Sequence, residues 1–340
     1  MVMEEIALLP MFILLLLLSS SSCQSSHEDR LTQAKPLSPG DKLVSKDGNF
    51  ALGFWSPDST NKILYIVIWY NNMAEHSPVW IANRVNPITS TPAGGSAKLA
   101  ITNDQQLALS DSNGQTLWMS TTTTVSTTTT GGGGAVAVLL DSGNFVLGSA
   151  NGTVIWQSFD HPTATILPSM KVMLSHKGQI VTRLVPWKSL DDPFPSDFIG
   201  SIDPNSNLQF FVWRGTLPYY RINFFSEASV FNGGGGANAT SVVVDTGDEV
   251  YYTYTVPNGS PYTRVLFGYT GAMGLLIWNN STSKWTAGFQ RPSSSCDLYA
   301  SCGPFGYCDT TGAAQAAGAS MDSTASTAMT SPEDAGGTRS

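Results

Sequence analysis

Cysteine and charge are both scarce in this sequence. Only four cysteines occur in 340 residues, and none lies between Cys23 and Cys296. Most of the chain therefore has no disulfide, and its stability must come from burial of apolar and aromatic side chains. Charged residues make up 12% of the chain and the formal net charge is -8. This balance argues against nucleic acid or an anionic membrane as the main partner.

Motifs for common enzyme chemistry are also missing. The four histidines lack metal-ligand spacing, and we expect no metal and no other cofactor. The glycine-rich runs carry no phosphate-loop lysine, and neither a Gly-x-Ser-x-Gly elbow nor the kinase motifs occur. Asp191 and Asp192 resemble a glycosidase pair, but their flanking prolines favour a solvated turn. We expect no catalytic residues and no enzymatic activity in this chain.

After the N-terminus there is no long hydrophobic run. Residues 6–18 are apolar except for Pro10 and lead into a small-residue zone that ends at Cys23. This segment is short for a membrane span and typical of a signal peptide, which we place at residues 1–26. The mature chain is expected to be secreted, with no membrane span. Asn-x-Ser/Thr motifs agree with export. The candidate glycosylation sites are Asn151, Asn238, Asn279 and Asn280.

What is present is a repeat. Residues 106–118 and 144–156 superimpose at an offset of thirty-eight residues. Each copy has an apolar run, an Asn-Gly pair and a second apolar run that ends in tryptophan. Asn-Gly tolerates the two positive φ values of a type I′ turn, so each copy predicts a tight β-hairpin. A divergent first copy begins at residues 47–54 and would close with residues 65–70.

Three similar hairpins favour a pseudo-threefold β structure, and three unrelated hairpins of a β-sandwich are the alternative. In the threefold arrangement Trp69, Trp118 and Trp156 would meet in one central core. Residues 159–290 predict a second all-β domain, because turn signals separate further strand-like runs. Those runs are residues 180–185, 208–213, 250–256, 264–269 and 275–278.

Four motifs point to a known family. Residues 156–163 read WQSFDHPT, and residues 37–40, 50–54 and 79–84 read LSPG, FALGF and VWIANR. Together they resemble plant S-locus glycoproteins and the ectodomains of G-type (bulb-type) lectin S-receptor-like serine/threonine-protein kinases. The resemblance implies an all-β chain with a β-prism II bulb-type lectin domain of three pseudo-symmetric repeats at residues 27–158. An S-locus glycoprotein domain would follow at residues 159–290.

The cysteine-containing segment is similar to the start of that family's EGF-like module, which we place, incomplete, at residues 291–312. EGF-like pairing implies a disulfide between Cys296 and Cys308 and leaves Cys302 as an unpaired thiol. Residues 313–340 depart from the family and are expected to be a disordered, aberrant tail produced by a frameshift or mis-splicing. The chain would then be a truncated ectodomain that lacks the membrane helix and kinase domain of its relatives.

The resemblance also implies a function: pollen recognition or defence-type signalling through an extracellular glycan or a protein or peptide ligand. Association with intact receptor-like kinases is a further expectation. Sugar-binding members carry Gln-x-Asp-x-Asn-x-Val-x-Tyr in each repeat, where alternate side chains of a strand converge on the sugar hydroxyls. No copy is complete here, so we expect degenerate sites, with repeat one the best remaining candidate. A functional secreted mannose-binding lectin is the alternative. The remnants are Asp47 and Asn49, Asp104 and Gln106, and Asn144 and Val146.

Overall fold

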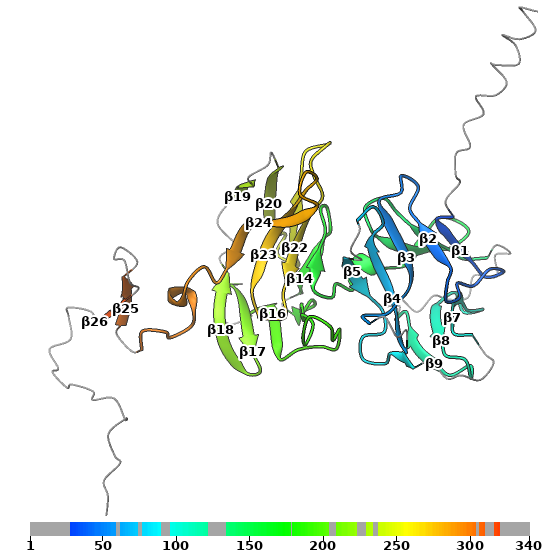
Figure 1. Cartoon of the computed structure of the whole chain (residues 1–340), viewed down its shortest axis with the longest axis horizontal. Helices are drawn as coiled ribbons and strands as arrows, with labels where there is room; N and C mark the ends of the chain where they lie inside the picture. Colours follow the sequence, from blue (N-terminus) through cyan, green and yellow to red (C-terminus); the bar gives the residue numbers. More distant parts are fainter. Residues whose placement is uncertain are drawn as a thin grey trace, which may run out of the picture.

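The computed structural model describes a chain that is almost entirely β, as predicted. Two β lobes lie side by side, with β1–β9 in one and β14–β24 in the other (Figure 1). The described residues are 28–58, 62–73, 77–89, 96–121, 134–177, 179–203, 209–222, 229–233, 237–303, 306–309 and 316–319. The predicted signal peptide lies outside them. Within these ranges no helix has the length and hydropathy that a membrane span requires.

The first lobe contains three antiparallel sheets. They are β2–β3–β4–β5, β7–β8–β9, and β10–β11–β12 with β1 at its edge. The strands are β1 (Arg30–Thr32), β2 (Lys42–Val44), β3 (Phe50–Trp55), β4 (Ile63–Tyr70), β5 (Pro78–Ile81), β6 (Ile88–Thr89), β7 (Lys98–Ile101), β8 (Leu107–Ser110), β9 (Thr116–Met119), β10 (Val136–Leu139), β11 (Phe145–Gly148) and β12 (Val154–Gln157).

The same strand pairing recurs in all three sheets. Ile68 pairs with Trp80, Leu109 with Trp118, and Leu147 with Trp156, and each pair lies beside a register shift of the same kind. A register shift of this type bends the strand and re-aims its side chains. Its threefold recurrence confirms the predicted pseudo-symmetric β-prism arrangement and rejects three unrelated hairpins.

The sequence prediction named the wrong tryptophan of repeat one for the central core. Trp80, Trp118 and Trp156 form the tryptophan hub, with ring centroids 5.8–5.9 Å apart in edge-to-face contacts. Trp69 follows Ile68 on β4, and successive side chains of a strand point to opposite faces. It therefore lies on the outer face of the first sheet, in a separate apolar cluster. The first sheet has a fourth strand, and that strand supplies the hub residue.

The predicted turn type was wrong as well. The hairpin at Asp111–Gln115 forms, but the positive φ falls on Gly114 alone, at 82°. The N–H of Gly114 donates to the Asp111 carbonyl over 3.1 Å, as in a type I turn followed by a left-handed glycine. The Asp111 carboxylate accepts from the N–H groups of Asn113 (2.9 Å) and Gln115 (2.8 Å), which holds this longer loop. The hairpin at residues 149–153 repeats the backbone pattern.

The second lobe is all-β, as expected. Its sheets are β13–β22–β23–β24, β15–β14–β21–β20–β19 and β16–β17–β18. The elements are η1 (Ser158–Asp160), β13 (Thr165–Ile166), β14 (Val172–His176), β15 (Gln179–Ile180), β16 (Phe198–Ile202), β17 (Phe210–Arg214), β18 (Leu217–Ile222), β19 (Ser229–Gly233), β20 (Ala237–Asp245), β21 (Glu249–Thr255), β22 (Thr263–Phe267), β23 (Met273–Asn279) and β24 (Lys284–Arg291).

Two local expectations differ from the structure. Only Ile180 of the run 180–185 lies in a strand, and Leu184 forms an isolated bridge to Gly200. Beyond η2 (Ser295–Asp297), β25 (Gly306–Asp309) pairs with β26 (Ala316–Ala319), which falls inside the predicted disordered tail. Strand pairing uses backbone groups, so the small side chains of this segment do not prevent it. The rest of that tail lies outside the described residues.

Candidate ligand-binding faces

In repeat one, the polar residues of the sugar-site pattern hold parts of the chain together. The Asn49 side-chain oxygen accepts a hydrogen bond from the Tyr262 hydroxyl of the second lobe over 2.7 Å. The backbone N–H of Asp47 donates to the Asp141 carboxylate over 2.7 Å. The Asp47 side chain itself is exposed. Asn49 thus connects the two lobes.

An aromatic layer covers the outer face of the first sheet. Ala51, at the valine position of the pattern, is fully buried, and Trp69 is 7% exposed. Trp55 of β3 packs against Trp187 of the second lobe, with ring centroids 5.9 Å apart. Trp187 also packs on the apolar cluster that contains Trp69. A sugar could reach this face only if those rings moved.

In repeat three, Asn144 is 7% exposed, and both the nitrogen and the oxygen of its side-chain amide are hydrogen-bonded. Its nitrogen donates to the Gln157 side-chain oxygen over 2.8 Å. Its oxygen accepts from the Ser158 hydroxyl and the Phe159 N–H, both over 3.2 Å. These bonds fix the start of η1. Val146 lies half-buried beside Gln157, its partner in the strand pair.

Repeat two is more open. The Asp104 carboxylate is exposed, and among the described residues neither it nor the Gln106 side-chain amide has a hydrogen-bond partner. Met119, which pairs with Ala108 on the outer face, is 41% exposed. In the first sheet, Ile81 pairs with Val67 of β4 in the matching place beside the hub tryptophan, and it is buried. The two repeats share the same strand pairing, yet the outer face is open in repeat two and covered in repeat one.

Arg84 joins the lobes next to repeat one. Its guanidinium donates three hydrogen bonds of 2.8 Å, to the carbonyls of Val185, Pro186 and Pro193. Burial lowers the pKa of Arg84 to about 10, so the group stays charged at neutral pH. Hydrogen bonds from a charged donor are among the stronger ones in proteins. Arg84 therefore fixes the loop that carries Trp187.

A second contact between the lobes is aromatic. Tyr70 is buried between Tyr262 and Trp285, at centroid distances of 5.2 and 5.4 Å. Its hydroxyl donates to the Thr263 carbonyl over 3.1 Å, and burial raises the pKa of Tyr70 well above its usual value. The Trp285 indole N–H donates to the Ser77 hydroxyl over 3.2 Å.

Comparison with known proteins decides the family. The D-mannose binding lectin model matches residues 77–188, and the S-locus glycoprotein domain model matches residues 221–317. S-locus-specific glycoprotein S6 of Brassica oleracea is 32% identical over 310 residues, which cover 88% of this chain and 68% of that protein. The chain belongs to the S-locus glycoprotein family. Its lectin-like and S-locus domains are those of the extracellular part of these proteins.

S-receptor-like kinases share the same region. G-type lectin S-receptor-like serine/threonine-protein kinase B120 of Arabidopsis thaliana is 33% identical over 281 residues. The match covers 79% of this chain and 32% of the kinase, so the chain spans about a third of that relative. Among solved structures, a monomeric mannose-binding lectin from Gastrodia elata is 20% identical and covers 38% of this chain and 96% of its own, with a TM-score of 0.28.

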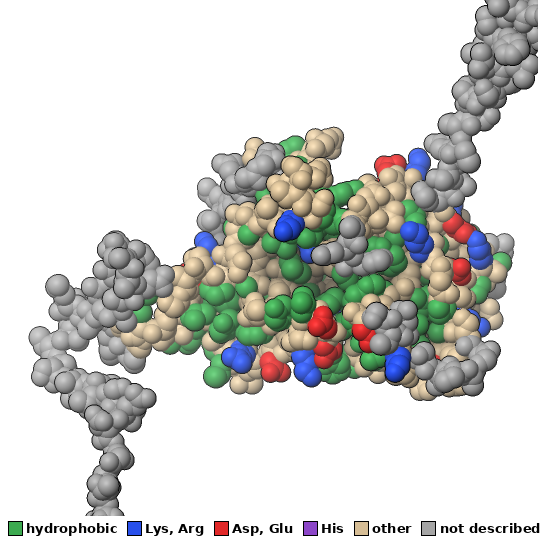
Figure 2. Space-filling model, in the orientation of Figure 1, with side chains coloured by type: hydrophobic (Ala, Val, Ile, Leu, Met, Phe, Trp, Pro, Cys, Tyr) green, Lys and Arg blue, Asp and Glu red, His purple; other side chains and the backbone are tan. Residues whose placement is uncertain are grey.

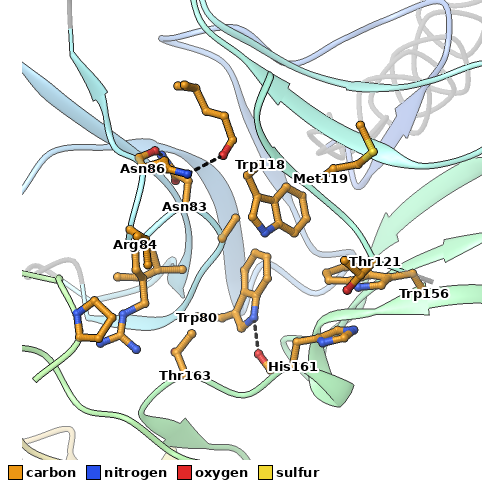
Figure 3. A pocket seen from close by; sticks show the side chains of 15 residues that line it. Trp80, Asn83, Arg84, Asn86, Trp118, Met119, Thr121, Trp156, His161 and Thr163 are labelled. Carbon is orange, nitrogen blue, oxygen red and sulfur yellow. Dashed lines mark hydrogen bonds between the residues drawn. The ribbon is translucent and has the colours of Figure 1, made fainter. Parts of the chain in front are cut away.

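Beside the tryptophan hub, this member of the S-locus glycoprotein family has a cavity of about 310 Å³. Figure 3 shows Trp80, Trp118 and Trp156 around it, together with Arg84 and His161. The Trp80 indole N–H donates to the His161 carbonyl over 2.9 Å, and the His161 ring stacks on Trp156. Burial lowers the pKa of His161.

Of the remaining predicted residues, Asn151 lies on the first lobe and the others lie on the second lobe and its C-terminal extension. Cys296 is bonded to Cys308, and Cys302 has no disulfide partner. The candidate glycosylation residues Asn151, Asn238 and Asn280 are exposed and Asn279 is half-buried. Asn151 lies at a hairpin tip, where its side-chain oxygen accepts from the Thr153 N–H over 3.0 Å. Within the described ranges, no three His, Cys, Asp or Glu side chains cluster as metal ligands do.

Sequence reasoning missed Trp80 and the contacts between the lobes. Trp80, Trp118 and Trp156 are each separated by the same thirty-eight residues that relate the second and third repeats. Extending that offset upstream would have selected Trp80 instead of Trp69. No comparable signal exists for the bond between Asn49 and Tyr262, because 213 residues separate them.

Proposed function

We propose that this chain is the extracellular recognition module of an S-receptor-like kinase or S-locus glycoprotein. Its role is pollen recognition or defence-type signalling through a glycan or a protein or peptide ligand. One observation carries the proposal: the chain's own residues occupy the sugar-site positions of repeats one and three. Recognition then uses the surfaces that remain, namely repeat two and the junction between the lobes. Intact receptor-like kinases are further proposed partners.

A second candidate function is a secreted mannose-binding lectin that acts through repeat two. The unpartnered side chains of Asp104 and Gln106 favour it. The pattern's valine and tyrosine are replaced there by Ala108 and Ser110. Each hydrogen bond contributes about 1 kcal/mol net, so loss of the tyrosine hydroxyl alone would weaken an already shallow site. At most one weak mannose site per chain is expected.

Calorimetric titration with methyl α-mannoside tests both candidates. The recognition-module proposal predicts no measurable heat, or weak binding at one site. If weak binding occurs, Asp104→Ala should remove it and Asp47→Ala, the matched carboxylate in repeat one, should leave it unchanged. Binding of three mannosides per chain would contradict both candidates, because two of the three faces are occupied. A glycan array and pollen-coat peptide fractions then search for the ligand of the module.

Export and glycosylation are part of the same proposal. The exposed hairpin position of Asn151 supports a glycan there that points into water. Expression in plant cells with the N-terminal 26 residues should deliver the chain to the medium. Treatment with an N-glycosidase should lower its mass through Asn151, Asn238, Asn279 or Asn280. Retention inside the cell without glycans would contradict this assignment.

A further inference from the structure

A larger groove of about 530 Å³ lies between the two lobes. One wall is β5, the last strand of the first sheet, together with Trp55. The facing wall consists of β22, the following loop to Thr270 and the Trp187 loop. Figure 2 shows hydrophobic side chains gathered over this middle part of the molecule, with acidic and basic side chains along one border. Such a groove has the size of a ligand site.

Arg264 lines the groove with an unpaired charge. The residue is 7% exposed, and its Nε has no hydrogen-bond partner. Its Nη1 approaches the Pro78 carbonyl at 3.5 Å, the limit of a hydrogen bond, and its guanidinium lies 4.3 Å from the Trp285 ring centre. No carboxylate of the described residues forms an ion pair with it. Burial of an unpaired charge is costly, and a charge of this kind in a cleft marks a candidate binding site.

Arg84 shows that the chain can satisfy a buried guanidinium when its role is structural. The Nε, Nη1 and Nη2 atoms of Arg84 each donate a hydrogen bond of 2.8 Å to a backbone carbonyl. Arg264 occupies a comparable position between the lobes, yet most of its hydrogen-bonding capacity is unused. A guanidinium presents a planar fork that matches a carboxylate. The missing partner of Arg264 therefore has the chemistry of a carboxylate group.

The other lining residues point to a sugar. Trp187 and the 45%-exposed Tyr269 present aromatic surface, which packs against the apolar face of a pyranose ring. Asp191 lies at the rim as an acceptor for hydroxyl groups. A small inorganic anion has no apolar face for these aromatic rings and therefore would not use this part of the lining. A ligand with hydroxyl groups and one carboxylate satisfies all of these features.

We infer that this groove binds a glycan that carries carboxylates, a uronic-acid oligosaccharide, with one carboxylate on Arg264 and sugar rings against Trp187 and Tyr269. The inference rests on the proposed recognition of an extracellular glycan and names its chemical class. It uses a surface that is separate from repeat two. An acidic peptide has the same charge but no pyranose ring.

Calorimetric titration of the full chain with trigalacturonate and with its methyl ester tests the inference. The ester removes the charge and keeps the sugar rings. The acid should bind about tenfold more tightly than the ester, because charge-assisted hydrogen bonds are lost in the ester. Arg264→Gln should abolish this preference, and Arg214→Gln, an exposed arginine away from the groove, should preserve it. Equal binding of acid and ester, no binding, or a preference that survives Arg264→Gln would overturn the inference.

Two further measurements keep the result interpretable. If Arg264→Gln does not fold, Tyr269→Ala changes an exposed side chain and should weaken acid and ester alike by about threefold or more, through lost ring packing. Unchanged affinity for both ligands in that variant would overturn the inference. An Asp- and Glu-rich peptide that binds more tightly than trigalacturonate would overturn it as well. Asp104→Ala should leave the uronate affinity intact, which separates failure here from failure of the mannoside test.

Discussion

Repeats one and two of the lectin lobe share the same strand pairing, but their outer faces differ in exposure to solvent. In repeat one, Ile81 is buried under an aromatic layer that the second lobe completes with Trp187. In repeat two, the equivalent Met119 is 41% exposed. Both sheets still contribute one tryptophan to the same hub. The inner face is thus set by the shared core, and the outer face is available for a second use.

The difference shows how a sugar-binding sheet can become a docking sheet. In repeat one the asparagine of the sugar pattern accepts a hydrogen bond from Tyr262, and the valine position is filled by the buried Ala51. The polar groups that would hold a sugar now hold a neighbouring lobe. Repeat two has no such neighbour, and its Asp104 stays exposed. Comparison of the two repeats therefore separates residues that serve packing from those available to a ligand.

The largest effect is expected at the hub that both repeats share. Trp80→Ala should lower the free energy of unfolding by about 3–5 kcal/mol, because it removes a buried indole and leaves a cavity. Chemical denaturation monitored by circular dichroism measures this loss. Trp213→Ala, on a half-buried residue of β17, is the control and should cost much less. A loss below about 1 kcal/mol for Trp80→Ala would mean that the hub is not the core of the lobe.

Next in size is Arg84, which holds the Trp187 loop over repeat one. Arg84→Met should cost about 2–3 kcal/mol, since three carbonyls lose a charged donor. Limited proteolysis should then cut near residues 185–193 faster than in the parent chain. Arg183→Met changes an exposed arginine of the same segment and should alter neither measurement. Equal proteolysis of the two variants would show that Arg84 does not position the loop.

A smaller effect tests directly whether the sugar-site asparagine of repeat one now binds the second lobe. Asn49→Ala and Tyr262→Phe each remove one partner of the 2.7 Å hydrogen bond between the lobes. A double-mutant cycle should give a coupling energy of about 1 kcal/mol. Asp104→Ala in repeat two should change stability by less than about 0.5 kcal/mol, as expected for an exposed side chain. A coupling energy of zero between Asn49 and Tyr262 would contradict the claim that repeat one, unlike repeat two, serves packing between the lobes.

The smallest effect concerns pH and the hub residue of repeat three. His161 stacks on Trp156, and burial lowers its pKa below the usual 6.5. In that range the unfolded chain binds the proton more readily, so stability should fall as pH drops from about 6.5 through the lower folded pKa. His161→Gln should remove this part of the pH dependence. Thermal unfolding between pH 5 and 7 measures the slope, and identical slopes in parent and His161→Gln would exclude the effect.

The sequence predicted local structure better than long-range contacts. The thirty-eight-residue offset locates β8, β9, β11 and β12 because each hairpin is encoded within its own segment. Trp69 was misplaced because β4 is apolar on both faces, so alternation could not indicate which face is inside. The burial of repeat one depends on Trp187 and Tyr262, which come from the other lobe. Such contacts leave no periodic or spacing signal in either segment.

Hydroxyl-radical footprinting of the intact chain tests the central contrast most directly. Oxidation at Trp69 and Met119, each divided by the intrinsic reactivity of its residue type, reports access to the outer faces of repeats one and two. Trp69, 7% exposed, should be protected about sixfold more than Met119, 41% exposed, in proportion to their exposed fractions. Equal protection of the two residues would contradict the assignment of repeat one to docking and repeat two to the open surface.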